Sequence, residues 1–86
     1  MTLLTHEHVR RIGEAAALMT AHGDVLSDFE RETIVAVCRC FRDFRREAAV
    51  SHAEWTVVET AIAAMARELR ADEEALAGFL ARTRAA

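Results

Sequence analysis

The side chains best suited to acid–base or nucleophilic chemistry in this chain are four histidines and two cysteines, Cys38 and Cys40. The histidines are His6, His8, His22 and His52. All four fall at or near the ends of the helices predicted below, where a histidine is more often a cap or a surface residue than a catalytic base. A nucleophile also needs a base beside it, and neither cysteine has one nearby in the sequence. We therefore predict no catalytic residues and a protein that is not an enzyme.

The same residues lack the spacing of a helical metal site, whose ligands lie three or four positions apart. His6 and His8 are two apart, as are the two cysteines. Residues two apart point to different faces of a helix, so the cysteines also cannot bridge each other. A zinc site shared by His22, Asp24 and His52 is the one alternative left open. With no glycine-rich phosphate loop either, we predict neither a metal nor a cofactor.

The most distinctive pattern is a set of arginines on one face of the predicted second helix. At about 100° per residue, five arginines share an arc that also contains Val35 and lies opposite the phenylalanines. The five are Arg31, Arg39, Arg42, Arg45 and Arg46. An exposed valine among arginines is typical of a protein interface. We therefore predict a partner protein with an acidic surface, or a second copy of the chain. An ordinary solvated face is the alternative, because Asp43 and Glu47 lie among the arginines.

Nucleic acid is the second candidate partner, because arginines can also bind phosphates. The formal net charge of −3 is unlike that of a typical nucleic-acid-binding domain, which is basic. Lysine, asparagine and glutamine, which share base-edge reading with arginine, do not occur in the chain. One tryptophan and no tyrosine leave few platforms for base stacking. A protein partner is therefore ranked first.

Three helix starts are marked by hydroxyl side chains that can cap a helix. Ser27 and Ser51 are each followed three residues later by a glutamate, Glu30 and Glu54, which is the capping-box pattern. Thr5 precedes the first run of apolar residues at helical spacing. These signals predict helices at about 6–22, 28–48, 52–71 and 73–84. We expect Gly23 to end the first helix in the left-handed conformation, and Asp72 to cap the fourth. The alternative is a third helix that runs straight through, because nothing at Ala71–Glu74 forbids it.

Apolar spacing predicts which faces of these helices meet. On the second helix one broad face collects three of the four phenylalanines. Its members are Phe29, Thr33, Ala36, Val37, Cys40, Phe41, Phe44 and Ala48. The third helix carries a seam with alternating spacings of three and four, which we expect to pack in the core. The seam residues are Trp55, Val58, Ile62, Met65 and Leu69. Leu18, Val35 and Val57 lie off these faces.

Composition bounds the fold class. The chain has 86 residues, of which 52% are hydrophobic and 29% charged, which excludes a disordered chain. With no proline and only three glycines, a fold rich in tight β-turns is excluded as well. We predict an all-α fold in a single domain, 1–86: a small antiparallel bundle of three long helices plus a short C-terminal helix. No stretch approaches about 18 apolar residues, so we expect no membrane span.

The segment Leu26–Ala66 resembles small helical-hairpin proteins of bacteria and their phages. The resemblance rests on the capped Leu-Ser-x-x-Glu start at Leu26–Glu30, an amphipathic helix and the second serine cap at Ser51. These are mostly capping residues, so no functional residue is carried over. Two reduced cysteines and the absence of a signal-peptide pattern favour the cytoplasm. We predict a non-enzymatic interaction module, such as a regulator, adaptor or inhibitor of the kind phages and plasmids encode, with a homodimer left open.

Overall fold

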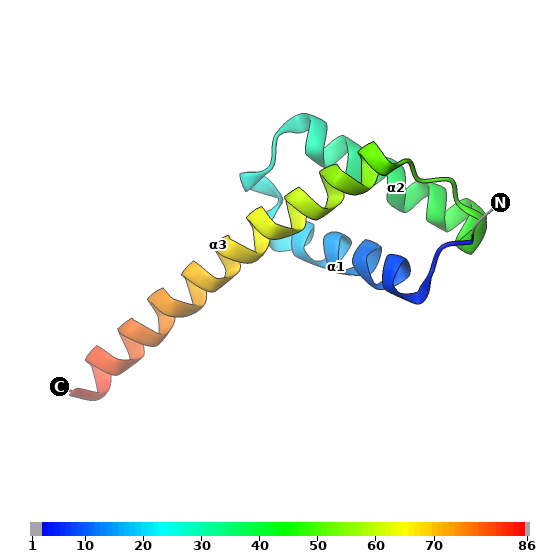
Figure 1. Ribbon diagram of the computed structural model, residues 1–86. Helices are drawn as coiled ribbons and strands as arrows, with labels where there is room; N and C mark the ends of the chain where they lie inside the picture. Colours follow the sequence, from blue (N-terminus) through cyan, green and yellow to red (C-terminus); the bar gives the residue numbers. More distant parts are fainter. Residues whose placement is uncertain (1–2, 86) are drawn as a thin grey trace.

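The computed structural model describes residues 3–85, and three long helices make up most of them. The elements are α1 (His6–His22), a 3₁₀ turn (Gly23–Val25), α2 (Asp28–Phe44), a second 3₁₀ turn (Arg45–Glu47) and α3 (His52–Ala85). The three helices all pack against one another, and α3 extends beyond the other two (Figure 1). The all-α prediction and the packing of the first three helices are confirmed.

All three predicted helix starts are confirmed, and each is capped reciprocally. The Ser27 Oγ accepts a hydrogen bond from the Glu30 N–H at 3.2 Å, and the Glu30 carboxylate accepts one from the Ser27 N–H at 2.9 Å. Ser51 and Glu54 form the same pair at the start of α3. At Thr5, the Nδ1 of His8 accepts the N–H of the cap residue, a role that glutamate usually takes. Each box satisfies two backbone donors that the helix leaves unpaired.

The first helix ends at His22 as predicted, but the end of the second helix and the conformation of Gly23 differ from the prediction. The second helix stops at Phe44 instead of 48, because Arg45 adopts a positive φ of 54° and the chain then makes a 3₁₀ turn. Tertiary contacts explain the early end: Ala48 is buried, and the Arg46 C=O accepts a hydrogen bond from the Leu4 N–H at 2.8 Å. Gly23 has a φ of −63° and begins a right-handed 3₁₀ turn, so it is not a left-handed terminator.

The predicted fourth helix does not exist as a separate element. The segments 52–71 and 73–84 belong to α3, which runs unbroken for 34 residues, or about 51 Å at 1.5 Å per residue. Asp72 therefore lies inside a helix and caps nothing. No proline or glycine falls between Arg70 and Ala77, and the residues there include good helix formers such as alanine and glutamate. The helix continues because nothing interrupts it.

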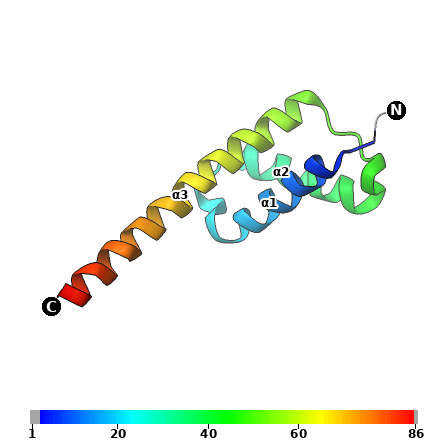
Figure 2. The ribbon, with the colours of Figure 1, turned by 60° about the horizontal axis from the view of Figure 1, so that its bottom comes forward.

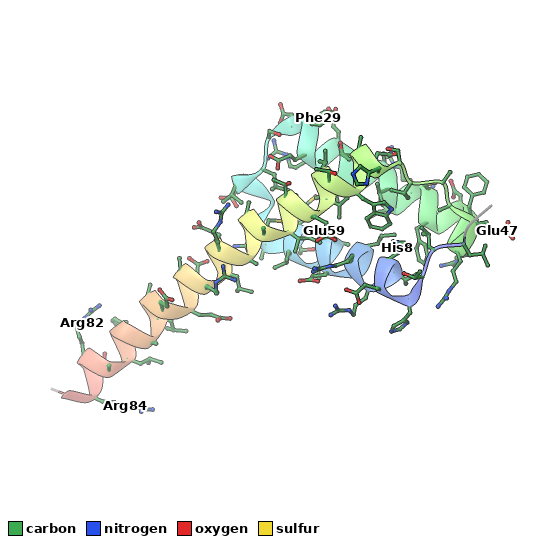
Figure 3. The ribbon with its side chains drawn as sticks, in the orientation of Figure 1. His8, Phe29, Glu47, Glu59, Arg82 and Arg84 are labelled. Atoms are coloured by element: carbon green, nitrogen blue, oxygen red, sulfur yellow. The ribbon has the colours of Figure 1, made fainter. Side chains whose placement is uncertain are left out.

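The core forms where α3 crosses α1 and α2. Its largest fully buried side chains are Ile34, Val37, Val58 and Met65. The seam prediction for α3 is confirmed at Val58, Ile62 and Met65, which are buried; Trp55 and Leu69 are half-buried. Arg11 Nε lies 3.3 Å from the Glu59 carboxylate and joins α1 to α3 at the edge of this core (Figure 3).

The predicted core face of α2 is wrong for half of its members: Val37 and Ala48 are buried and Cys40 and Phe41 pack against the core, but the other four do not. Phe29 and Phe44 are 66% and 59% exposed, whereas Ile34, absent from the predicted face, is fully buried. The face that packs inward is rotated by about 60° from the predicted one, at about 100° per residue, and shares Val37 and Phe41 with it. It runs through Ile34, Val37 and the partly buried Phe41. Phe29 instead borders α3 at the surface, and Phe44 lies near Leu3 and the second 3₁₀ turn.

The molecule is elongated because α3 is longer than the helices beside it. Its longest dimension is 61 Å, and its radius of gyration is 16.2 Å, against about 12 Å for a compact domain of this length. Figure 2 shows the C-terminal half of α3 projecting away from α1 and α2. We call residues 70–84 the arm and residues 3–69 the body. Every residue of the arm is exposed except Gly78, whose exposure is intermediate.

Candidate functional site

The structure separates the five predicted arginines into different environments. Arg31 is used structurally: its Nη1 donates to the carbonyl oxygens of Gly23 and Leu26 at 3.1 and 3.0 Å. Its Nη2 pairs with the Asp28 carboxylate. These contacts join the start of α2 to the 3₁₀ turn before it. Arg31 therefore lies away from the remaining arginines and fastens the α1–α2 connection.

Arg45 and Arg46 leave the helical arc because α2 ends at Phe44. The Arg45 guanidinium lies 5.9 Å from the centre of the Phe41 ring, a cation–π distance. Both residues are exposed at the second 3₁₀ turn. The helical arc of arginines around Val35 is thereby reduced to Arg39 and Arg42.

Arg39 and Arg42 flank a groove between α1 and α2, which we call the cationic groove. Its lining consists of Ala16, Met19, Val35, Cys38, Arg39 and Arg42. The groove has a volume of about 300 Å³, and its lining surface is almost wholly apolar. Arg42 pairs with its neighbour Asp43 at 3.0 Å, and both side chains are largely exposed. Arg39 forms no ion pair with any residue of 3–85.

Cys38 lies on the floor of the cationic groove. Burial raises the pKa of its thiol, because the charged thiolate is disfavoured away from water. A raised pKa lowers the fraction of thiolate, which is the reactive form. The groove is therefore built for apolar contact and holds no activated nucleophile at this position.

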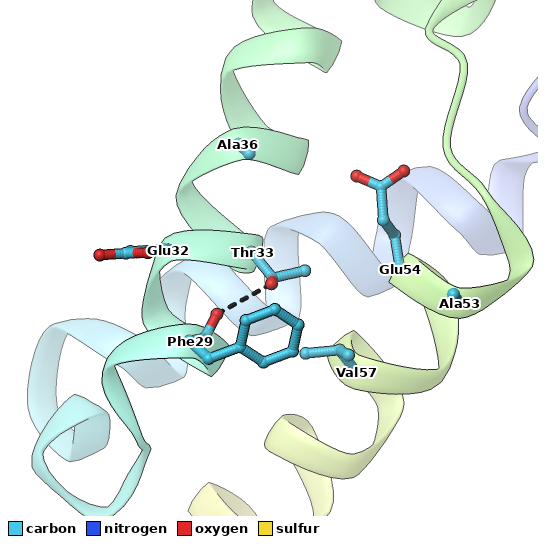
Figure 4. Close-up of a pocket in the computed structure, with 7 residues that line it drawn as sticks. All are labelled: Phe29, Glu32, Thr33, Ala36, Ala53, Glu54 and Val57. Atoms are coloured by element: carbon cyan, nitrogen blue, oxygen red, sulfur yellow. Dashed lines mark hydrogen bonds between the residues drawn. The ribbon is translucent and has the colours of Figure 1, made fainter.

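A second groove lies on the other side of α2, where that helix borders α3. We call it the acidic groove. Phe29, Glu32, Thr33 and Ala36 line it from α2, and Ala53, Glu54 and Val57 line it from α3 (Figure 4). Its volume is also about 300 Å³. The Thr33 hydroxyl donates to the Phe29 C=O at 2.8 Å, so its methyl group is left toward the apolar lining.

Sequence reasoning missed the acidic groove because it assigned Phe29, Thr33 and Ala36 to the core. Val57, which lies off the predicted seam of α3, was the one available signal. Periodicity alone did not show that the phenylalanine side of α2 would meet Val57 at a surface. The two grooves thus share a size and an apolar lining, but they differ in their charged residues: Arg39 and Arg42 line one, and Glu32 and Glu54 line the other.

Two of the four histidines make structural contacts, whereas His6 and His52 are exposed. His8 completes the cap at Thr5 and stacks on Trp55, with ring centroids 4.7 Å apart. His22 lies 3.9 Å from the Asp72 carboxylate, where the end of α1 meets α3. Across residues 3–85, no three histidine, cysteine, aspartate or glutamate side chains gather closely enough to hold a metal ion, so His22, Asp24 and His52 do not form the zinc site left open above.

None of the helices within residues 3–85 combines the length and apolar character that crossing a membrane requires. Comparison of the chain with known protein families, curated proteins and solved structures gives no match. The geometry of the grooves and of the arm is therefore the basis for assigning a function.

Proposed function

We propose that this protein is a non-enzymatic interaction module that binds an acidic segment of another protein in the cationic groove, as a regulator, adaptor or inhibitor of that partner. One observation carries the proposal: the groove joins an apolar floor to two arginines and includes no carboxylate in its lining. The two free cysteines support a cytoplasmic location for the encounter.

The two parts of the groove have different tasks in binding. Val35, Met19 and Cys38 offer apolar surface, whose removal from water contributes about 25 cal/mol for each Å². Arg39 and Arg42 are exposed at the edge, where charges mainly speed association and select the partner's sign. Because they are three residues apart on a helix, both guanidinium groups project from the same side. The partner that fits is an amphipathic helix with one large apolar side chain flanked by carboxylates.

The acidic groove supplies the matched comparison that makes the proposal testable. Val35 and Val57 are both half-buried valines at the floor of a groove, and Arg39 and Glu32 are exposed charges of opposite sign. An acidic peptide is attracted to one groove and repelled from the other. Charge therefore selects between two sites that apolar contact alone would not distinguish.

The experiment uses a displayed library of helical peptides selected on the wild-type protein. We expect the enriched peptides to carry acidic residues around a large apolar residue. Val35→Asp and Arg39→Glu should each weaken binding of a selected peptide by at least about tenfold, or about 1.4 kcal/mol. The controls Val57→Asp and Glu32→Arg should bind as the wild type does. Circular dichroism verifies that all four variants keep their helical content.

Two results would contradict the proposal. The first is a selected peptide that binds the wild type and Val35→Asp equally well. The second concerns nucleic acid: retention of a short labelled DNA duplex at low salt, abolished by Arg39→Glu, would assign the arginines to phosphates instead. The dispersal of Arg31, Arg45 and Arg46 away from the groove leads us to expect no retention.

A further inference from the structure

The core-facing side of α3 continues along the arm without anything to cover it. In the body this side presents Val58, Ile62 and Met65, which are buried between α1 and α2. At the same spacings of three and four residues, it presents Leu76 and Phe79 in the arm, where they are 58% and 57% exposed. Leu80 is also exposed beside them. We call Leu76, Phe79 and Leu80 the arm stripe.

The core-facing side of α3 changes from buried to solvent-exposed where α1 ends. Leu69 is half-buried against the last turns of α1, in a hollow that Leu18 and His22 also line. One turn later, Asp72 lies beside His22. Beyond Asp72, α1 and α2 are too short to reach α3. The arm stripe is thus a direct extension of an interface already formed within the chain.

We propose that a second copy of this chain covers the arm stripe, with the two arms packed antiparallel. The charges of the arm support this occupant. Asp72, Glu73 and Glu74 outnumber Arg70 in its first half, and Arg82 and Arg84 lie near its end. An antiparallel pair places the acidic half of each arm against the basic half of the other, whereas a parallel pair would place like charges together.

A definite register follows from symmetry. When the two-fold axis passes between Ala77 and Gly78, Leu76 of each copy meets Phe79 of the other. Thr83 then lies opposite Asp72, within reach of its carboxylate. The arms overlap over about 21 Å, since the 14 paired residues 71–84 rise 1.5 Å each. The apolar contacts thus lie at the centre of the pair, and polar contacts lie at its two ends.

The arginines fit the two edges of this pairing. Figure 3 shows Arg82 and Arg84 on opposite sides of the helix, so they flank the arm stripe from both edges. In an antiparallel pair each edge meets the same edge of the other copy. Arg84 therefore faces Glu73 of the second copy, and Arg82 faces Asp72 of the second copy. The acidic and basic halves of the arm are complementary in charge, which favours a second copy of the chain over an unrelated partner.

The pairing is independent of the proposed function, because the arm stripe and the cationic groove share no residue. Sedimentation equilibrium of the full chain from about 1 µM to about 1 mM tests it. We expect the mass to rise with concentration from one chain to two. Phe79→Glu should remain at one chain throughout, and Phe29→Glu, an equally exposed phenylalanine in the body, should dimerise as the wild type does.

A charge exchange tests the direction of the pair. Glu73→Arg and Arg84→Glu should each raise the dissociation constant several-fold, and the two together in one chain should restore it. A wild type that stays at one chain throughout, a Phe79→Glu variant that still dimerises, or a double variant that is not restored would each overturn the antiparallel pairing. Binding of a selected acidic peptide by Phe79→Glu remains a separate measurement of the cationic groove.

Discussion

The two halves of α3 carry the same apolar pattern in opposite surroundings. In the body, Met65 lies on the inward side and is fully buried. In the arm, Leu76 lies on the same side three turns later and faces solvent. The difference arises from length: α1 and α2 have 17 residues each, and α3 has 34. Periodicity thus indicates which side of a helix is apolar, but the lengths of its neighbours decide how much of that side the chain itself can cover.

The largest expected difference between the two halves of α3 comes from truncating one apolar side chain in each. Met65→Ala should lower the free energy of unfolding by about 2–5 kcal/mol, because it leaves a cavity in a packed core. Leu76→Ala should change the stability of the dilute monomer by no more than about 0.5 kcal/mol, as is usual at exposed positions. Chemical denaturation at low concentration measures both. Equal losses would show that the arm is packed within the single chain.

Adding volume tests the same contrast from the other direction. Ala61 is fully buried and Ala75 is exposed, and both lie on the same side of α3, two heptads apart. Ala61→Leu should cost about 1–3 kcal/mol, because a close-packed core cannot take the extra methyl groups without strain. Ala75→Leu should leave thermal unfolding of the dilute protein unchanged. If Ala61→Leu is tolerated equally well, α3 lies less closely on the body than described.

Removing a cap tests whether α3 is one helix. Ser51→Ala should cost about 1 kcal/mol, because Ser51 caps the only N-terminus that α3 has. Asp72→Ala should cost less than about 0.5 kcal/mol, because it loses only a surface contact with His22. Urea denaturation distinguishes the two variants. A larger loss for Asp72→Ala than for Ser51→Ala would restore the separate fourth helix.

The smallest effect concerns a surface ion pair at the start of α1. A hydrogen bond from Arg10 is the main reason why the pKa of Glu7 is lowered. A lowered pKa means that the contribution of Glu7 to stability is present above the pKa of the unfolded chain and is lost as the pH falls. An NMR titration should show Glu7 with a midpoint below that of glutamate in unfolded peptides, and Arg10→Ala should raise it. An unchanged midpoint in Arg10→Ala would show that Arg10 does not lower the pKa of Glu7.

Features decided by contacts close in sequence could be predicted, and features decided by helix packing could not. The capping boxes at Ser27 and Ser51 depend on residues three apart, so the sequence shows them directly. The end of α2 depends on the burial of Ala48 and on the bond from Leu4 to Arg46, which only the fold provides. The predicted face of α2 followed its large phenylalanines, whereas the helix buries Ile34 in the core.

The candidate site divides in the same way. Val35, Arg39 and Arg42 share one side of a helix, and spacing was enough to group them. Their groove also needs Met19 from α1, and the acidic groove needs Val57 beside Phe29, so both depend on how helices pair. The arm stripe was hidden because a break in the helix was predicted at Asp72. Because the helix is continuous, Leu76 and Phe79 lie on the same side of α3 as the seam residues. There they form an exposed apolar surface.

Amide hydrogen exchange, measured residue by residue at several protein concentrations, tests most directly whether the two halves of α3 differ only in what covers them. We predict that amides at 55–69 exchange slowly at every concentration, because the body protects them within one chain. Amides at 73–83 should exchange quickly in dilute solution and slow down as the concentration rises. Arm amides that exchange at one rate over the whole range, whether fast or slow, would contradict the account.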